Sequence, residues 1–168
     1  GLWSVLRLSE DEVLKGSLLI TLYENLRWKT ISPQGFRDEM LAYLPNESNS
    51  LLFSMALSYL GDCQRIFPSD SRPLEQVLWK IVTTNPVSQH RLQAFRLYRS
   101  IADSEEAVQR LYTLWQERKA PKDCALSESD YIGLSYILAI HLPEKADKII
   151  ATQLSRIQNP DRKKELSL

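Results

Sequence analysis

Apolar residues recur at spacings of three and four along most of the chain, and no run alternates convincingly with period two. This spacing places apolar side chains on one face of an α-helix, whereas a half-buried strand needs strict alternation. The clearest stripe, which follows the i, i+3, i+4, i+7, i+8 pattern, is Leu74, Val77, Leu78, Ile81 and Val82. The chain also has 27 Leu against 17 Val and Ile together, which favours helix over strand. We therefore predict an all-α protein.

Capping residues and prolines divide the chain into helical segments. Ser9 with Glu12 matches the capping box that opens a helix, and Ser32-Pro33 places a capping side chain before a proline at the first helical position. Pro45 and Pro143 each end a segment, because proline lacks the N–H that a continuing helix needs. The predicted helices begin near residues 9, 32, 47, 71, 87, 104, 127 and 146, and Asn159-Pro160-Asp161 opens one more.

Short connections make consecutive helices antiparallel neighbours. The helices group into four hairpins that start near residues 9, 47, 87 and 127, a period of roughly 40 residues that is typical of two-helix solenoid repeats. We predict a right-handed αα-solenoid of the HEAT or armadillo kind, with about eight antiparallel helices in one helical-repeat domain over residues 1–168. A closed helical bundle is the structural alternative.

Charge and hydropathy exclude two classes of partner. Lys and Arg number 21, Asp and Glu also 21, and the net charge is zero, whereas proteins that bind duplex nucleic acid carry a basic excess. Leu18-Leu19-Ile20 is typical of the purely apolar runs, which are far too short to cross a bilayer. We expect no nucleic-acid partner and no membrane span.

The residue types that perform catalysis or bind metals are few and scattered. His90 and His141 lie 51 positions apart, Cys63 and Cys124 lie 61 apart, and no H-E-x-x-H pattern occurs. We therefore expect no catalytic residue, no metal ligand and no cofactor in this chain; a hydrolase using His90 or His141 is the least favoured alternative. Cys63 falls on an apolar helix face and should be buried, Cys124 falls in a loop and should be more exposed, and no disulfide should join them.

One basic cluster is a candidate for binding. Arg96 and Arg99 fall on the same side of the predicted helix 87–102, opposite Phe95 and Tyr98. On a concave solenoid surface, these arginines would contact an anion or the carboxylate of a peptide substrate. Alternatively, this side is an ordinary solvated face whose arginines pair with neighbouring acidic residues.

Five segments together resemble the aminopeptidase N family of zinc metallopeptidases. They are Leu18–Leu26 (LLITLYENL), Ile31–Phe36 (ISPQGF), Leu44-Pro45-Asn46-Glu47, Ala107–Trp115 (AVQRLYTLW) and Arg156–Arg162 (RIQNPDR). The resemblance spans nearly the whole chain, and its evidence is the order and spacing of the segments.

The resemblance implies the C-terminal helical domain of such an enzyme, an α-solenoid that closes over the active site and limits access by size. The zinc and the H-E-x-x-H motif would belong to a catalytic domain of the same polypeptide, and the partners would be that domain and the peptide substrate. No catalytic residue of the family is matched in this chain. An independent HEAT- or armadillo-like interaction scaffold is the alternative, and the compartment is left open between cytoplasm and periplasm.

The two ends of the chain are unusually apolar for a solenoid, whose terminal repeats are normally polar caps. Leu2, Val5 and Leu8 precede the first clear capping residue, and the chain stops at Leu166-Ser167-Leu168. We expect at least one end helix to present an apolar strip that packs on residues outside these 168.

Overall fold

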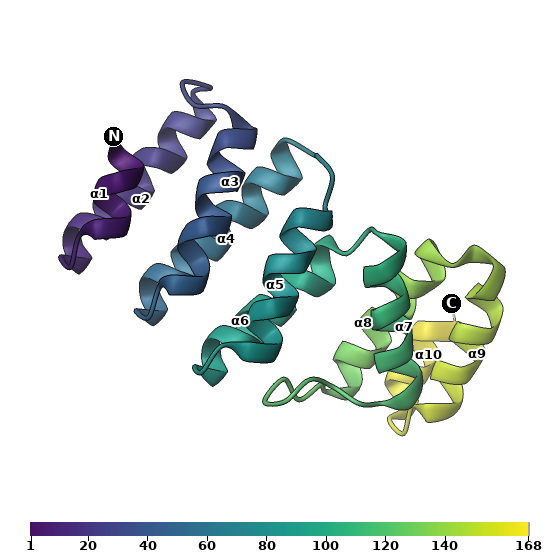
Figure 1. The fold of residues 1–168 in the computed structure, drawn as a ribbon. Helices are drawn as coiled ribbons and strands as arrows, with labels where there is room; N and C mark the ends of the chain where they lie inside the picture. Colours follow the sequence, from purple (N-terminus) through teal and green to yellow (C-terminus); the bar gives the residue numbers. More distant parts are fainter. Residues whose placement is uncertain (168) are drawn as a thin grey trace. The chain divides into compact units, whose positions relative to one another are not determined.

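All regular structure is helical in residues 1–167, the part of the chain that the computed structural model describes, with side chains described to residue 164. The prediction of an all-α protein is therefore confirmed (Figure 1). In chain order, the elements are α1 (Leu2–Leu8), α2 (Glu12–Arg27), α3 (Pro33–Tyr43), the 3₁₀ turn η1 (Leu44–Asn46), α4 (Ser50–Ile66), α5 (Arg72–Thr84), α6 (Ser88–Ile101), α7 (Glu105–Glu117), α8 (Glu128–His141), the 3₁₀ turn η2 (Pro143–Lys145), α9 (Ala146–Arg156) and α10 (Pro160–Ser167).

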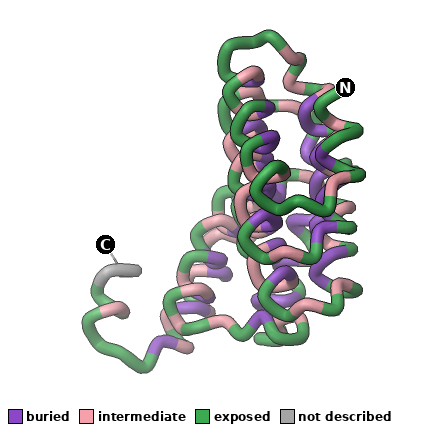
Figure 2. The backbone as a smooth tube through the Cα atoms, turned by 90° about the vertical axis from the view of Figure 1, so that its left-hand side faces the viewer, coloured by how far each residue is buried: buried purple, intermediate pink, exposed green. Residues whose placement is uncertain are grey.

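The chain forms two compact units, Gly1–Ile101 with α1–α6 and Ala102–Leu168 with α7–α10. In the first unit, α1 packs on α2, α3 on α4 and α5 on α6, while α4 also packs on both α2 and α6. Figure 1 shows the odd-numbered helices of this unit as one layer and the even-numbered helices as another. The buried positions face one another between these layers (Figure 2). The sequence predicts the segments 71–84 and 87–102 in different hairpins, whereas α5 and α6 pack along one another.

The largest side chains of the core are aromatic, Leu or Met. In the first unit, the fully buried ones include Leu6, Leu19, Leu22, Leu26, Phe36, Met40, Leu44, Phe53, Leu60, Leu78, Phe95 and Tyr98. They come from all six helices and the η1 turn, as expected when each helix turns one apolar stripe toward the opposite layer.

Most helix starts lie where the capping residues predict them. Ser32 and Ser104 accept hydrogen bonds from backbone N–H groups at the starts of α3 and α7, and Ser127 forms a complete capping box with Asp130. The predicted box of Ser9 with Glu12 is wrong. Asp11 caps α2 instead, through hydrogen bonds from Val13 N and Leu14 N, while Ser9 Oγ accepts from Asp11 N.

Helix α1 was not expected from the sequence. It has only seven residues and begins at Gly1, which has no side chain to cap it, so local signals are missing. Tertiary contacts hold it in place: Leu6 is fully buried, Trp3 meets Phe36 edge-on at 5.7 Å, and Arg7 pairs with Glu39.

The expected apolar strip is present on α1. Leu2, Val5 and Leu8 are exposed, Leu8 to 82%. What covers this strip stays a prediction. The corresponding expectation at Leu166-Ser167-Leu168 lies outside the residues whose side chains are described.

In the second unit, α8 packs on α7 and α9, and α9 packs on α10. Trp115, Leu134, Leu138 and Ile149 are nearly or fully buried and form much of its core. The loop between α7 and α8 spans residues 118–127 and contains Cys124, as the sequence predicts.

Helix α2 ends in a left-handed residue, Lys29, with φ of 58°. Lys29 N donates to Leu26 O and Thr30 N donates to Asn25 O, the pair of bonds that defines a Schellman motif. We expect Lys29→Gly to raise the free energy of unfolding by about 0.5–1 kcal/mol, because Gly adopts this conformation without a Cβ clash. Urea unfolding measures the effect. The matched control, Lys80→Gly within α5, should lose about 1 kcal/mol, and equal losses in both variants would contradict the prediction.

Candidate functional site

Arg96 and Arg99, the two arginines predicted to bind a ligand, differ in their exposure on α6. Arg96 is exposed, whereas Arg99 is half-buried and its guanidinium carbon lies 5.4 Å from the centre of the Phe95 ring. Arg99 therefore leans toward the aromatic residue that sequence analysis placed on the opposite side. Their role in binding a peptide or anion stays a prediction.

A groove runs between α4 and α6 beside these arginines. It has a volume of about 490 Å³ and is lined by Leu57, Ser58, Gly61, Asp62, Gln64, Arg65, Leu97, Ser100 and Ile101. Gly61 brings the two helices close, since a Cβ at this position would lie 3.0 Å from Leu97 Cδ1. Ser100 lies one helical turn after Arg96, so the exposed arginine and the groove belong to the same side of α6.

The wall of this groove formed by α4 is held by a polar network. Tyr23 donates a hydrogen bond of 2.9 Å to Asp62 Oδ2, and Arg65 pairs with the other carboxylate oxygen. The Tyr23 ring stacks on Tyr59, with ring centres 4.2 Å apart. Burial, followed by the hydrogen bond to Asp62, raises the pKa of Tyr23, so it is a proton donor and not a base at neutral pH.

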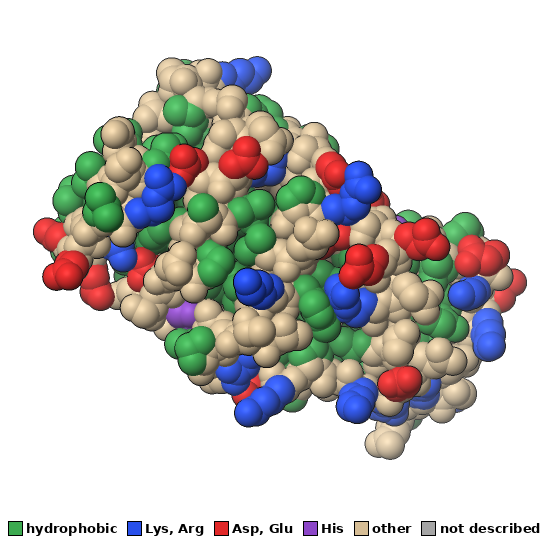
Figure 3. Space-filling view, viewed as in Figure 1, with side chains coloured by type: hydrophobic (Ala, Val, Ile, Leu, Met, Phe, Trp, Pro, Cys, Tyr) green, Lys and Arg blue, Asp and Glu red, His purple; other side chains and the backbone are tan. Residues whose placement is uncertain are grey.

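Charges of both signs are interspersed on the face of the first unit that Figure 3 draws. Apolar side chains lie between them, and neither the acidic nor the basic side chains form a continuous field there. This face thus lacks the single-sign charge that would attract a polyanion over a wide area.

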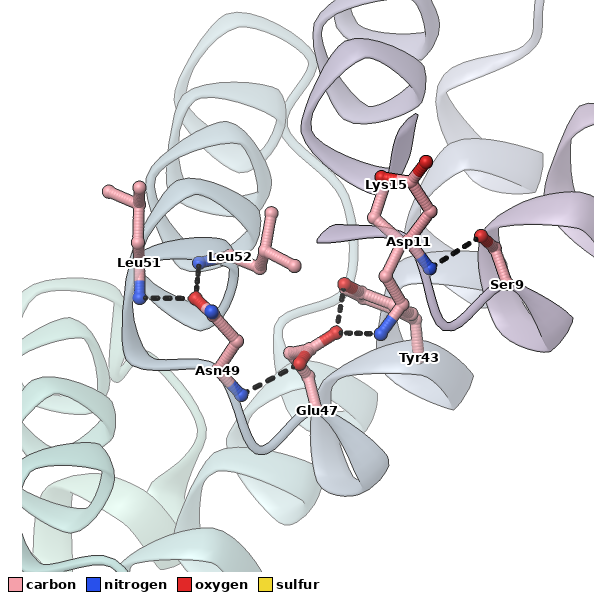
Figure 4. Close-up of polar contacts among 8 residues, drawn as sticks. All are labelled: Ser9, Asp11, Lys15, Tyr43, Glu47, Asn49, Leu51 and Leu52. Carbon is pink, nitrogen blue, oxygen red and sulfur yellow. Dashed lines mark hydrogen bonds and ion pairs between the residues drawn. The ribbon is translucent and has the colours of Figure 1, made fainter. Parts of the chain in front are cut away.

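A buried carboxylate, Glu47, joins three elements of the first unit (Figure 4). Glu47 Oε2 accepts from Lys15 Nζ at 2.7 Å and from the Tyr43 hydroxyl, while Oε1 accepts from Asn49 N at 2.8 Å. Asn49 in turn caps α4 through its side chain. The Glu47 side chain is 2% exposed and that of Lys15 is 16% exposed, so this ion pair is shielded from water. The cluster ties α2 and α3 to the start of α4.

Hydrogen bonds, more than burial, decide the protonation of this cluster. Burial raises the pKa of Glu47, but hydrogen bonds from Lys15, Tyr43 and Asn49 outweigh it and lower the pKa below its ordinary value. Burial and the bond to Glu47 raise the pKa of Tyr43 far above its ordinary value. Because Glu47 is ionised and its partners are already engaged, the cluster is suited to holding structure and not to transferring protons.

His90 is another buried titratable group of this unit. Its Nε2 lies 3.1 Å from Ser50 Oγ, and its ring stacks on Phe53 at 4.0 Å between centres with the planes 2° apart. His90 is fully buried, and its Nδ1 has no hydrogen-bond partner among the described residues. A Ser–His contact can activate a serine, but a nucleophile of this kind normally needs a third group on Nδ1 to orient the imidazole.

The second histidine belongs to the other unit. His141 lies at the end of α8, and its Nδ1 is 4.0 Å from Asp103 Oδ1, whose side chain is 79% exposed. In the part of the chain that the structure describes, no three His, Cys, Asp or Glu side chains group as metal ligands would. Also within that part, no helix is both long and apolar enough to cross a bilayer.

Both cysteines are free and buried. Arg37 Nη1 lies 3.6 Å from Cys63 Sγ and also donates to Phe67 O, and burial raises the pKa of the Cys63 thiol despite the arginine. The expectation that Cys124 is exposed is wrong. Its side chain is fully buried, and its backbone N–H donates to Pro121 O in a turn of the loop.

We expect the native chain to react slowly with a thiol reagent such as Ellman's reagent, because only an exposed thiolate reacts fast. After unfolding in denaturant without reductant, two thiols per chain should react. One fast thiol in the native protein would contradict the burial of Cys124 or Cys63, and fewer than two after unfolding would indicate a disulfide.

In the second unit, Trp115 is the centre of a further polar network. Trp115 Nε1 donates to Gln153 Oε1 at 2.8 Å, and the Arg156 guanidinium lies over the Trp115 ring at 4.9 Å. Arg156 also donates to Trp115 O and Gln116 O, at 2.9 and 2.8 Å. The end of α9 is thereby joined to the end of α7, and two carbonyl groups in the last turn of α7 gain a hydrogen-bond donor.

Comparison with family models, with curated proteins and with solved structures gave no significant match. The candidate features therefore come from the structure alone. They are the α4–α6 groove with Arg96 on the surface, and the buried networks of Glu47 and His90 inside the first unit.

The sequence does not predict the networks of Glu47 and His90. The signal for Glu47 is its place after Leu44-Pro45, and the signal for His90 is a histidine in an amphipathic segment. Neither signal names the distant partner, because Lys15 lies 32 residues from Glu47 and Ser50 lies 40 residues from His90.

Proposed function

We propose that this chain is the non-catalytic, C-terminal helical domain of a zinc aminopeptidase of the aminopeptidase N kind. In this proposal, its helices form a right-handed αα-solenoid of the HEAT or armadillo type. It closes over the active site of a catalytic domain in the same polypeptide and shapes the access of peptides. The zinc and the reacting groups belong to that catalytic domain.

The observation that carries the proposal is that segments resembling the family, although far apart in the sequence, contact each other. Arg156, the first residue of the RIQNPDR segment, covers and hydrogen-bonds Trp115, the last residue of AVQRLYTLW. Arg162, the last residue of RIQNPDR, pairs with Glu128, which lies outside these segments, at the start of α8 at 3.5 Å. Contacts of this kind are expected of residues that a family shares for its fold.

The Leu44–Glu47 segment supports the proposal in the same way. It forms the η1 turn and delivers Glu47 to Lys15, which lies one turn before the LLITLYENL segment on α2. The ISPQGF segment starts α3 with Ser32 as its cap and buries Phe36. Each segment thus has a defined role in packing, as expected for a domain whose task is to present a stable surface.

An independent interaction scaffold is the second candidate, and the groove between α4 and α6 favours it. A groove of about 490 Å³ with a mixed apolar and polar lining is large enough for several side chains of a bound protein segment. This candidate needs no catalytic domain in the same polypeptide.

The test is to express the complete gene product that contains this sequence. The aminopeptidase proposal expects an H-E-x-x-H motif on the N-terminal side, about one zinc per chain, and hydrolysis of aminoacyl-anilides that a chelator abolishes. Arg96→Ala should then change the kinetics of long peptides more than those of the anilide, with Lys80→Ala as the exposed control. A complete product without that motif and without peptidase activity would reject the proposal and favour the scaffold.

A further inference from the structure

His90 closes the contact between the first turns of α4 and α6. It is the third residue of α6, and both of its identified partners come from α4: Ser50, the first residue of that helix, and Phe53. The imidazole is fully buried, with one face covered by the Phe53 ring. A titratable ring is therefore buried in the contact between the first turns of α4 and α6.

The surroundings of His90 stabilise a neutral imidazole better than a protonated one. Protonation adds an N–H, yet Nδ1 has no acceptor among the described residues. The ring also lies at the N-terminal ends of two helices, where the positive ends of the helix dipoles repel a cation. Of the charged groups described on α4, α5, α6 and η1, the one that acts on His90 is the Glu47 carboxylate. Its oxygens already accept bonds from Lys15, Tyr43 and Asn49, so it is a weak counterion for His90.

We propose that His90 is an acid-sensitive lock between α4 and α6: the neutral ring holds the first turns of the two helices together, and its protonation releases them. In the released state, the imidazolium reaches water, and the first turn of α6 separates from Ser50 and Phe53. The device is independent of the proposed peptidase role, since it depends only on contacts inside the first unit.

The sign of the pH dependence follows from linkage. Burial lowers the pKa of His90 below its ordinary value of 6.5, so the locked state resists the proton and the released state binds it. The α4–α6 contact therefore has its full stability above pH 6.5 and weakens as the pH falls below this value. The equilibrium constant for its opening rises by up to roughly tenfold per pH unit. Glu47, whose pKa is lowered from 4.5, acts only at still lower pH. The window between pH 6.5 and 5 thus isolates histidine.

Hydrogen exchange of the full chain at pH 7 and pH 5, corrected for the intrinsic exchange rate, tests the proposal. The wild type should show more opening at pH 5 than at pH 7 for the amides near the starts of α4 and α6, by up to about tenfold for each pH unit below 6.5. His90→Gln keeps a group that can bond Ser50 but cannot titrate, and should abolish the rise. His141→Gln, the matched control at the other histidine, should retain it. A rise that persists in His90→Gln, or no rise in the wild type, would overturn the proposal.

A titration of the wild type covers the case in which His90→Gln does not fold. The NMR signal of the His90 ring should report a pKa below 6.5, and opening at the two helix starts should follow the linkage curve that this pKa sets. A His90 ring that titrates at or above 6.5 while the helix starts stay closed would reject the lock.

Discussion

Glu47→Ala should lower the free energy of unfolding by about 3–5 kcal/mol, the usual effect of removing one partner from a buried ion pair. The substitution leaves the Lys15 ammonium, which is mostly buried, without its carboxylate. It also removes the hydrogen-bond acceptor of the Tyr43 hydroxyl and that of Asn49 N at the start of α4. Urea unfolding followed by circular dichroism measures the loss.

Two variants control for this result. Glu24→Ala removes an exposed carboxylate whose oxygen is 3.7 Å from Arg27, and should change the free energy of unfolding by less than about 0.5 kcal/mol. Glu47→Gln keeps the shape but not the charge and should be intermediate. Equal effects of Glu47→Ala and Glu24→Ala would mean that the cluster does not stabilise the fold.

The contribution of Glu47 should also depend on pH. Its pKa is lower in the folded chain than its ordinary value of 4.5, so its stabilising effect is present above that value and is lost as the pH falls through the folded pKa. The difference in stability between wild type and Glu47→Gln should therefore shrink below pH 4.5. A difference that stays constant down to pH 3 would contradict this reasoning.

Trp115→Ala should have a comparable effect in the second unit, a loss of about 3–5 kcal/mol. Trp115 is 2% exposed, and removing it leaves a cavity, an unpaired Gln153 amide oxygen and an Arg156 guanidinium without its aromatic face. Because Arg156 also satisfies the last carbonyl groups of α7, the end of that helix should exchange its amides faster in the variant.

The exposed Trp28 provides the matched control, since its side chain is 77% exposed. Trp28→Ala should change the free energy of unfolding by no more than about 0.5 kcal/mol. Trp115→Phe keeps an aromatic ring but loses the indole N–H, and should cost about 1–3 kcal/mol through the unsatisfied Gln153. If Trp115→Ala and Trp28→Ala were equally mild, the second unit would not depend on this network.

The sequence by itself determined the elements of this protein. Apolar spacing and caps such as Ser32, Ser104 and Ser127 act within one or two helical turns, so the all-α class and most helix starts follow from neighbouring residues. The errors arise where local signals are ambiguous or missing. Ser9 and Asp11 are both good caps, and only the path of the chain decided between them. Helix α1 has no capping side chain and exists because Leu6 is buried.

Only the tertiary structure decided which side chains meet. Three side-chain contacts join residues that are distant in the sequence. Lys15 and Glu47 are 32 residues apart, Ser50 and His90 are 40 apart, and Trp115 and Gln153 are 38 apart. Periodicity states which face of a helix is apolar, but the neighbour on that face depends on how the helices pack and at what register. The burial of Cys124 is of the same kind, since a loop residue acquires its environment from elements distant in the sequence. The pKa of a buried group is also decided by the tertiary structure, because it depends on desolvation and on partners that exist only in the folded chain. The acid sensitivity inferred for His90 therefore has the same origin.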